Sequence, residues 1–400
     1  MSRRSQVFHY DEVGIVHCVQ RCVRRAYLSG KDSASGKNYE YRREWIRRRM
    51  ELLASVFGLD VLTYAVMSNH LHVILRTRPD VVQGWDEEEI AQRWLRLFPG
   101  KRLEDHLGSP TQQDIQVALG DAKKLASWRK RLSDISWFMR ALAEPIARKA
   151  NHEDKCTGRF WEGRFKAQKI ADEAGLLACA MYVDLNPIRA AMASSPEQSR
   201  FTSAFDRIQA RKGVKYRPAI LEFMNDQPDE ATILNLLRTA QSKGDREEIA
   251  SLKRQLKRCK QQARKKSPEQ HSSKADSRDC WLAPLELMEQ SSMESLKHYR
   301  GFRASDKGFL PMTVDEYLTL LDWTGKHKKE GKRGAIPDDI APILERIGVE
   351  GSMWCDLVWD YTKYFGRSQA AGHPNSLKRL AANQDLRWIR GQSKVREFFL

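Results

Sequence analysis

Two histidines separated by one residue are the first candidates for chemistry. His70 and His72 flank Leu71 within a run rich in valine, leucine and isoleucine, which is typical of a strand. Residues i and i+2 of a strand point to the same face, so both imidazoles can reach one divalent ion while Leu71 packs on the other face. Strands with two solvated histidines show the same spacing. The pair therefore indicates a metal site only in combination with its surroundings.

A tyrosine and an asparagine lie at the end of a strongly apolar segment. Residues 173–185 are expected to form a helix that ends near Asn186, because the residue before Pro187 disfavours the helical conformation. Tyr182 and Asn186 are four residues apart and so share one helix face. Beside a metal ion, a phenol oxygen can attack a phosphodiester, and an amide oxygen can complete the coordination of the ion. The alternative is a tyrosine that belongs only to the core.

A third segment, residues 158–170, interleaves cations with aromatic rings. Cations for phosphates and flat faces for bases are typical of a groove that binds single-stranded nucleic acid. The alternative is a set of core aromatic residues surrounded by solvated charges. Glu162 lies in the same run and is a candidate general base or further metal ligand. The cations are Arg159, Arg164, Lys166 and Lys169, and the rings are Phe160, Trp161 and Phe165.

The elements that must position these residues indicate an α+β fold. Two strands at residues 59–67 and 70–77 are separated by Ser68 and Asn69, which predicts an antiparallel hairpin. Apolar residues at helical spacing predict the helices. The other strands are expected at residues 14–20 and 165–170, the helices at 39–57, 135–150 and 173–185, and a mostly helical insertion at about 80–131.

Four segments in this order resemble the HUH-type single-tyrosine transposases, in particular the branch of REP-associated tyrosine transposases. The order of the segments, their residues and the residues around them all agree with this family, and this combined agreement is more specific than any single motif. The resemblance covers about residues 8–205, roughly half of the chain. The segments are GIVHCVQR at residues 14–21, YAVMSNHLHVIL at 64–75, GRFWEGRFKAQKI at 158–170 and CAMYVDLNPIRA at 179–190.

The resemblance implies a ferredoxin-like HUH domain over residues 8–215, with an antiparallel sheet of four to five strands, packed helices and a mainly helical C-terminal extension. It implies that His70 and His72, together with Asn186, bind Mg²⁺ or Mn²⁺. It also implies that Tyr182 attacks a phosphate of single-stranded DNA and is left as a 5′-phosphotyrosine beside a free 3′-hydroxyl. No nucleotide cofactor is expected, since the phosphotyrosine preserves the energy for rejoining and the sequence contains no GxxxxGK[ST] loop.

Single-stranded or hairpin DNA is the partner that the resemblance implies, and the charge of the chain agrees with it. Lys and Arg number 69 against 52 Asp and Glu, and the net charge of +17 favours a polyanionic partner. Residues 241–266 alone contain ten Lys or Arg and three acidic residues. The residues expected to contact DNA are Arg21, Arg159, Trp161, Arg164, Lys166 and Lys169.

Composition also bears on the compartment. The longest apolar run, residues 176–183, is far shorter than the roughly 20 residues of a membrane span, so no membrane partner is expected. No signal-peptide core follows Arg3 and Arg4. Seven cysteines without a CxxC pair favour reduced thiols over disulfides. We therefore expect a cytoplasmic, nucleoid-associated protein.

Three parts of the chain are expected, and more than one function remains open. The catalytic domain at residues 8–215 is followed by a basic helix and linker at 240–278 and by a helical region of unknown role at 279–400. The leading function is a transposase, that is, a metal-dependent endonuclease and strand transferase acting on single-stranded hairpin or repeat DNA. The alternatives are a domesticated, non-transposing DNA-binding regulator of repeats with the same fold, and an RNA-binding protein. Both a monomer and a homodimer are compatible with the sequence.

Overall fold

The structure is a computed structural model of the 400-residue chain. It describes residues 11–23, 29–30, 36–98, 110–216, 218, 277–287, 301–326, 341–346, 348–366 and 368–399. The basic helix and linker expected at residues 240–278 lie outside the described residues, except for residues 277 and 278.

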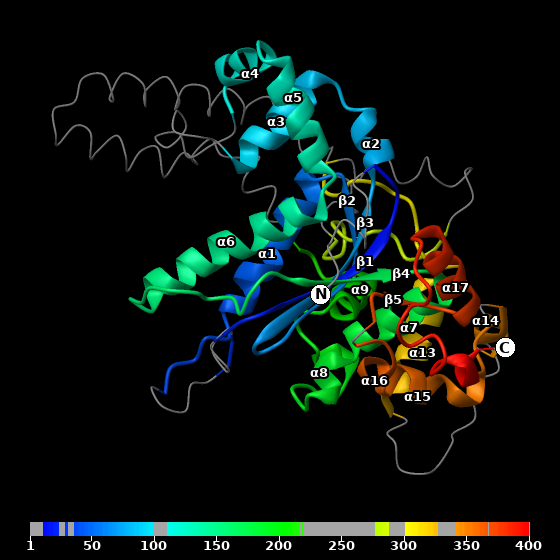
Figure 1. Ribbon diagram of the computed structural model, residues 1–400. Coiled ribbons are helices and arrows are strands. Elements are labelled where there is room, and N and C mark those ends of the chain that lie inside the picture. Colours follow the sequence, from blue (N-terminus) through cyan, green and yellow to red (C-terminus); the bar gives the residue numbers. More distant parts are fainter. Residues whose placement is uncertain are drawn as a thin grey trace.

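A five-stranded sheet forms the centre of the fold, with the strand order β2-β3-β1-β4-β5 (Figure 1). The first four strands pair antiparallel, and β2 and β3 form the predicted hairpin. The α+β fold is therefore confirmed, as are the four strands expected from the sequence. The strands are β1 (Ile15–Arg21), β2 (Leu59–Val66), β3 (His70–Thr77), β4 (Lys166–Ile170) and β5 (Ala370–Ala371).

The fifth strand differs from the expected purely antiparallel sheet. β5 pairs with β4 in parallel, with Lys169 opposite Ala370 and Ile170 opposite Ala371. The sheet is therefore mixed. A strand of two alanines carries no alternation of apolar and polar residues, so its sequence does not mark it as a strand, and only its contact with β4 defines it.

Helices α1 (Arg42–Val56) and α6 (Ile135–Glu153) cover one face of the sheet, where Leu71, Val73 and Leu75 of β3 are buried. The prediction that Leu71 packs on the face of the sheet opposite to the two histidines is thus confirmed. The predicted insertion packs at the end of this layer and stands at the top of Figure 1. Its described helices are α2 (Pro79–Gln83), α3 (Glu87–Leu97), α4 (Gln112–Leu119) and α5 (Ala122–Leu132).

Helix α7 (Glu173–Asp184) lies on the other face of the sheet, and all of its residues from Ala174 to Asp184 are buried. A helix that is apolar on every side must be covered on every side. The sheet covers one side of α7, and helices from the C-terminal part of the chain cover the other. With 12 residues, α7 is too short for a membrane span, and no other helix among the described ranges is long and apolar enough to cross one.

The C-terminal helices share one apolar core with α7 and the sheet. Gly175 allows the close approach: a Cβ at this position would lie 2.7 Å from the carbonyl oxygen of Ala371 in β5. Asp172 caps α7 by accepting a hydrogen bond from Gly175 N and also accepts one from His373 N. The remaining described helices are α8 (Asn186–Arg189), η3 (Pro196–Gln198), α9 (Ser203–Arg211), α13 (Val314–Lys326), α14 (Ala341–Arg346), η5 (Gly351–Met353), α15 (Trp354–Trp359), α16 (Tyr361–Phe365), α17 (Pro374–Asn383) and η6 (Arg396–Phe398).

A buried ion-pair network also joins the C-terminal part of the chain to the hairpin. Asp60 of β2 is fully buried and accepts hydrogen bonds from Arg76, Arg78 and the hydroxyl of Ser305. Removing one member would leave a charge buried without its partner, which is costly. The segment around Ser305 is therefore held against β2 by charge as well as by packing.

Candidate active site

The sheet register brings three histidines to the face that α7 covers. His70 and His72 of β3 point to this face, since their neighbours Leu71 and Val73 belong to the core on the other face. His17 of β1 points the same way, and its ring lies 5.1 Å from that of His72, centroid to centroid. The rings of His70 and His72 lie 4.8 Å apart.

The hydrogen bonds of the two β3 histidines use the same ring nitrogen. Nδ1 of His72 is 2.9 Å from Nε2 of His17, and Nδ1 of His70 is 2.6 Å from Oδ1 of Asn69. Nε2 of His72 is buried and has no hydrogen-bond partner among the described residues. A metal-binding imidazole typically bonds through its other nitrogen to a neighbouring group that fixes its tautomer and orientation. This pattern leaves Nε2 of each imidazole available as a ligand.

Burial keeps the three imidazoles neutral near pH 7. It lowers the pKa of His70 to about 4, and the Arg21 cation contributes to the same shift. Burial also lowers the pKa of His17 to about 4, against a hydrogen bond to Gln168 that raises it. The pKa of His72 falls well below its usual value, first through burial and then through the nearby charges of His17, His70 and Arg189. Neutral imidazole is the form that binds metal ions.

Tyr182 lies beside these histidines, as the sequence predicts for a shared site. Its ring makes edge-to-face contacts with His72 at 5.5 Å and with His17 at 6.2 Å between centroids. Only 6% of Tyr182 is exposed. Residues that are more than one hundred positions apart in the sequence are thus brought together, because α7 packs across β3 and β1.

Asn186 follows one turn later, although the helix does not continue through it. α7 ends at Asp184, Leu185 keeps a right-handed helical conformation, and Asn186 begins the short helix α8 with Pro187 in its first turn. Proline is well tolerated there because the first helical N–H groups have no partner within the helix. Asn186 is 8% exposed, and its Nδ2 is buried without a hydrogen-bond partner among the described residues.

Buried atoms without hydrogen-bond partners occur in the set that the sequence predicts to hold a divalent ion, His70, His72 and Asn186. Two buried polar atoms without partners, Nε2 of His72 and Nδ2 of Asn186, both belong to the predicted ligand set. Such atoms are costly unless a ligand or water satisfies them. Rotating the amide by 180° exchanges its nitrogen and oxygen, which changes only the hydrogen-bonding pattern. Within the described ranges no group of three His, Cys, Asp or Glu side chains is placed to hold a metal ion, so this set depends on the amide.

Three residues that the sequence reasoning did not assign to the site also lie in it. His17 bonds to His72, and Tyr361 stacks on Tyr182 with 4.7 Å between ring centroids. The Arg189 guanidinium carbon lies 4.9 Å from the Tyr182 ring centroid. His17 and Arg189 occur inside the motif segments, and for His17 a polar residue on the histidine face of a strand is a usable signal. Tyr361 lies 179 positions after Tyr182, and its sequence contains no comparable signal.

The residues expected to contact DNA divide between the two faces of the sheet. Arg21 lies opposite His70 and forms an exposed ion pair with Glu162 at 3.8 Å, so Glu162 is engaged at the edge of the site. Lys166 lies opposite Val19, and Val19 lies opposite His72. Because residues paired across strands point to the same face, Lys166 is on the face of the site, where it is exposed. Lys169 lies opposite the core residue Val16 and therefore points to the other face.

Two of the three aromatic residues of segment 158–170 belong to the core and not to a surface for stacking bases. Phe160 and Phe165 are buried in the core beneath α6, so the stacking interpretation is wrong for these two rings. Trp161 is partly buried, and its indole N–H donates a hydrogen bond to the carbonyl of Ala143. Arg159 and Arg164 are exposed in the loop before β4. Arg159, Arg164 and Lys166 are thus exposed to solvent, while Phe160 and Phe165 serve the fold.

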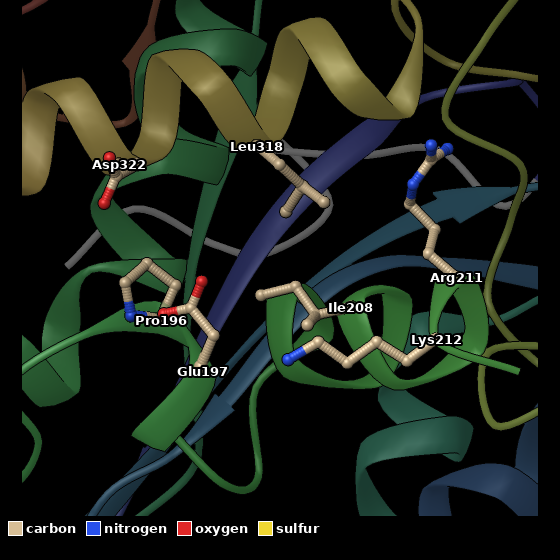
Figure 2. A pocket seen from close by; sticks show the side chains of 7 residues that line it. All are labelled: Pro196, Glu197, Ile208, Arg211, Lys212, Leu318 and Asp322. Atoms are coloured by element: carbon tan, nitrogen blue, oxygen red, sulfur yellow. The ribbon is translucent and has the colours of Figure 1, made fainter. Parts of the chain in front are cut away.

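A separate pocket of about 260 Å³ lies between η3, α9 and α13 (Figure 2). Cationic and anionic side chains face each other across it, and Asp322 on its rim forms an ion pair with Lys326. It contains none of the histidines and not Tyr182. The lining residues are Pro196, Glu197, Ile208, Arg211, Lys212, Leu318 and Asp322.

No protein-family model and no curated protein matches this chain. Among solved structures, the chain is similar to one described as "Structure of the REP associates tyrosine transposase bound to a REP hairpin". The match covers 51% of this chain and 82% of that chain, at 14% sequence identity and a TM-score of 0.27. A similarity at this level does not by itself establish a shared fold or activity.

Proposed function

We propose that this protein is a metal-dependent endonuclease and strand transferase for single-stranded hairpin or repeat DNA, with Tyr182 as its nucleophile. One observation carries the proposal: the Tyr182 ring contacts the His72 imidazole, whose buried Nε2 has no hydrogen-bond partner among the described residues. A phenol next to an imidazole with a free ligand atom is the arrangement that attack on a phosphodiester beside a metal ion requires.

The reaction follows from these groups. The Tyr182 oxygen, after loss of its proton, forms a bond to the scissile phosphorus, and the bond from phosphorus to the 3′ oxygen breaks. The leaving oxygen takes up a proton, which yields a 3′-hydroxyl and a 5′-phosphotyrosine. Attack of a 3′-hydroxyl on that phosphotyrosine reverses the step and rejoins DNA, so no nucleotide cofactor is consumed.

His70, His72 and Asn186 would hold the ion, Mg²⁺ or Mn²⁺. A bound divalent cation would neutralise phosphate charge and stabilise the charge that develops during attack. The low pKa values of the histidines keep them neutral, so no proton has to be displaced before they act as ligands. Arg21 and Lys166, exposed on the same sheet face, are placed to neutralise neighbouring phosphates of the DNA backbone.

A second candidate function is a DNA-binding regulator of repeats that does not cleave. The burial of Tyr182 beneath Tyr361 favours this alternative, since a nucleophile must reach its phosphate. The two functions differ in covalent capture of DNA and not in DNA affinity.

The test is a denaturing gel of the protein incubated with end-labelled single-stranded hairpin DNA from its genomic flanks, with Mg²⁺ or Mn²⁺ and then with EDTA. Wild type is compared with Tyr182→Phe and His70→Ala, and an RNA hairpin of the same sequence runs alongside. We expect a metal-dependent protein–DNA band that both variants lose. Tight binding of several DNA hairpins without such a band would favour the regulator, and preferential binding of RNA would favour an RNA-binding role.

A further inference from the structure

The described C-terminal helices reach the candidate nucleophile directly. Tyr361 of α16 stacks on Tyr182 with 4.7 Å between ring centroids and 19° between ring planes. Tyr361 is 1% exposed, and its ring edge also faces His17 at 6.5 Å. One wall of the site thus comes from a part of the chain outside the segments that the family resemblance covers.

A glutamine of the sheet fixes the position of Tyr361. The Tyr361 hydroxyl donates a hydrogen bond to Oε1 of Gln168 in β4, at 2.8 Å. Nε2 of Gln168 in turn donates to the carbonyls of Phe365, at 2.6 Å, and Ser368, at 3.1 Å. Gln168 lies opposite His17 in the β1–β4 register, so it faces the site. A single buried amide therefore links the sheet to the ring and to the C-terminal end of α16.

A second connection runs through Arg189 of α8. Its guanidinium carbon lies 4.9 Å from the Tyr182 ring centroid, and its Nη2 donates a hydrogen bond to the carbonyl of Trp359 at 2.7 Å. The Trp359 indole N–H donates to the carbonyl of Thr324 in α13, which anchors this end of α15. The cation next to Tyr182 is thus oriented by the C-terminal helices as well.

We propose that the corner formed by α15 and α16 positions Tyr182 for attack, with Tyr361 fixing the plane of its ring and Arg189 holding a positive charge beside it. This inference rests on the proposed function. A tyrosine oxygen lies at the end of a side chain with two rotatable bonds, so restricting the ring restricts the oxygen. A misplacement of about 1 Å in a reacting group can cost about 100-fold in rate. Residues that act in this way alter the rate of the chemical step and leave DNA affinity unchanged.

The experiment measures single-turnover formation of the covalent adduct at saturating hairpin DNA, together with hairpin affinity in EDTA. For Tyr361→Leu, which removes the stacked ring, we expect an adduct rate about 10- to 100-fold lower with unchanged affinity. Tyr361→Phe keeps the stacked ring and removes only its hydrogen bond to Gln168, so its adduct rate should lie between those of wild type and Tyr361→Leu. Tyr364→Leu is the matched control, because Tyr364 lies in the same helix and packs on Phe398 instead of Tyr182.

A second measurement does not depend on cleavage. With 3-fluorotyrosine incorporated at position 182, the ¹⁹F NMR signal reports the environment and rotation of that ring. We expect one static environment in the otherwise unchanged protein and in the Tyr364→Leu variant, and an averaged, shifted signal in the Tyr361→Leu variant.

The outcomes separate the two proposals. If wild type forms no adduct while the fluorine signal responds to Tyr361→Leu as expected, the proposed function fails and the positioning contact stands. An adduct rate in Tyr361→Leu equal to or higher than that of wild type overturns the positioning role, and a higher rate would mean that Tyr361 obstructs Tyr182. An equal loss in Tyr361→Leu and Tyr364→Leu also overturns this role, since that result reports general damage to the C-terminal helices.

Discussion

Nε2 of His17 lies 2.9 Å from Nδ1 of His72, so a side chain of β1 bonds to the second histidine of the pair on β3. The residues are 55 positions apart and meet because β1 and β3 are neighbours in the sheet. This bond occupies Nδ1 of His72 and leaves Nε2, which is buried, as a potential ligand atom. His70 and His72 have the spacing of a metal-binding pair, and the bond to His17 holds the His72 imidazole in a defined orientation.

The first prediction concerns this bond. Replacing His17 by Ala removes the partner of His72 Nδ1, and loss of such an outer partner typically lowers metal affinity about 10- to 100-fold. Titration with Mn²⁺, followed by electron paramagnetic resonance, measures the affinity. His152→Ala, a substitution of an exposed histidine on α6, is the control and should leave it unchanged. Equal Mn²⁺ affinity in wild type and His17→Ala would show that His17 does not support the site.

A second prediction uses the two faces of β4. Lys166→Gln, on the site face, should weaken hairpin binding at every sequence and reduce the slope of log affinity against log salt by about 1. Lys169→Gln removes the same charge from the opposite face and should leave the slope near that of wild type. Fluorescence anisotropy over a range of salt concentrations measures both. If both variants had the same slope as wild type, the DNA would bind elsewhere on the protein.

A third prediction concerns the buried Asp60. Asp60→Asn leaves the guanidinium groups of Arg76 and Arg78 without their shared carboxylate, and the free energy of unfolding should fall by about 3–5 kcal/mol. Asp322→Asn disrupts an exposed pair with Lys326, which solvent screens, and should leave the free energy of unfolding close to that of wild type. Urea unfolding of the full chain compares the two. A small change for Asp60→Asn would mean that the network contributes little to stability.

A fourth prediction concerns the contact between α7 and β5. The Cβ of Gly175→Ala would lie 2.7 Å from the Ala371 oxygen, so the variant should lose about 1–3 kcal/mol through overpacking, despite the better helix propensity of alanine. Gly120→Ala is the control, because its Cβ would meet the nearest atom at an ordinary 3.5 Å. Thermal unfolding measures both variants. A Gly175→Ala variant as stable as wild type would show that β5 can move away from α7 at little cost.

Elements whose residues carry a periodic pattern could be predicted from the amino-acid sequence alone. Strands β1 to β4, the β2–β3 hairpin, and helices α1, α6 and α7 follow from local alternation, helical spacing and turn residues, because these signals act over a few positions. Spacing within each segment and the family resemblance together predicted a site of His70, His72, Tyr182 and Asn186, and ring contacts join the first three of these residues. Their functional roles remain predictions, which the experiments above address.

The residues that surround this set are defined by packing between distant segments of the chain. Phe160 and Lys169 look like members of a DNA-binding run in the sequence, yet burial and register direct them away from the site. Tyr361 forms part of the wall of the site, and β5 is a parallel strand of the sheet. The local sequence around each of them indicates neither role. The physical reason is that a face, a register and a contact depend on packing between segments as much as 245 residues apart. The conformational propensity of a short segment cannot specify such packing. The packing is specified instead by burial of the core that α7, the sheet and the C-terminal helices share.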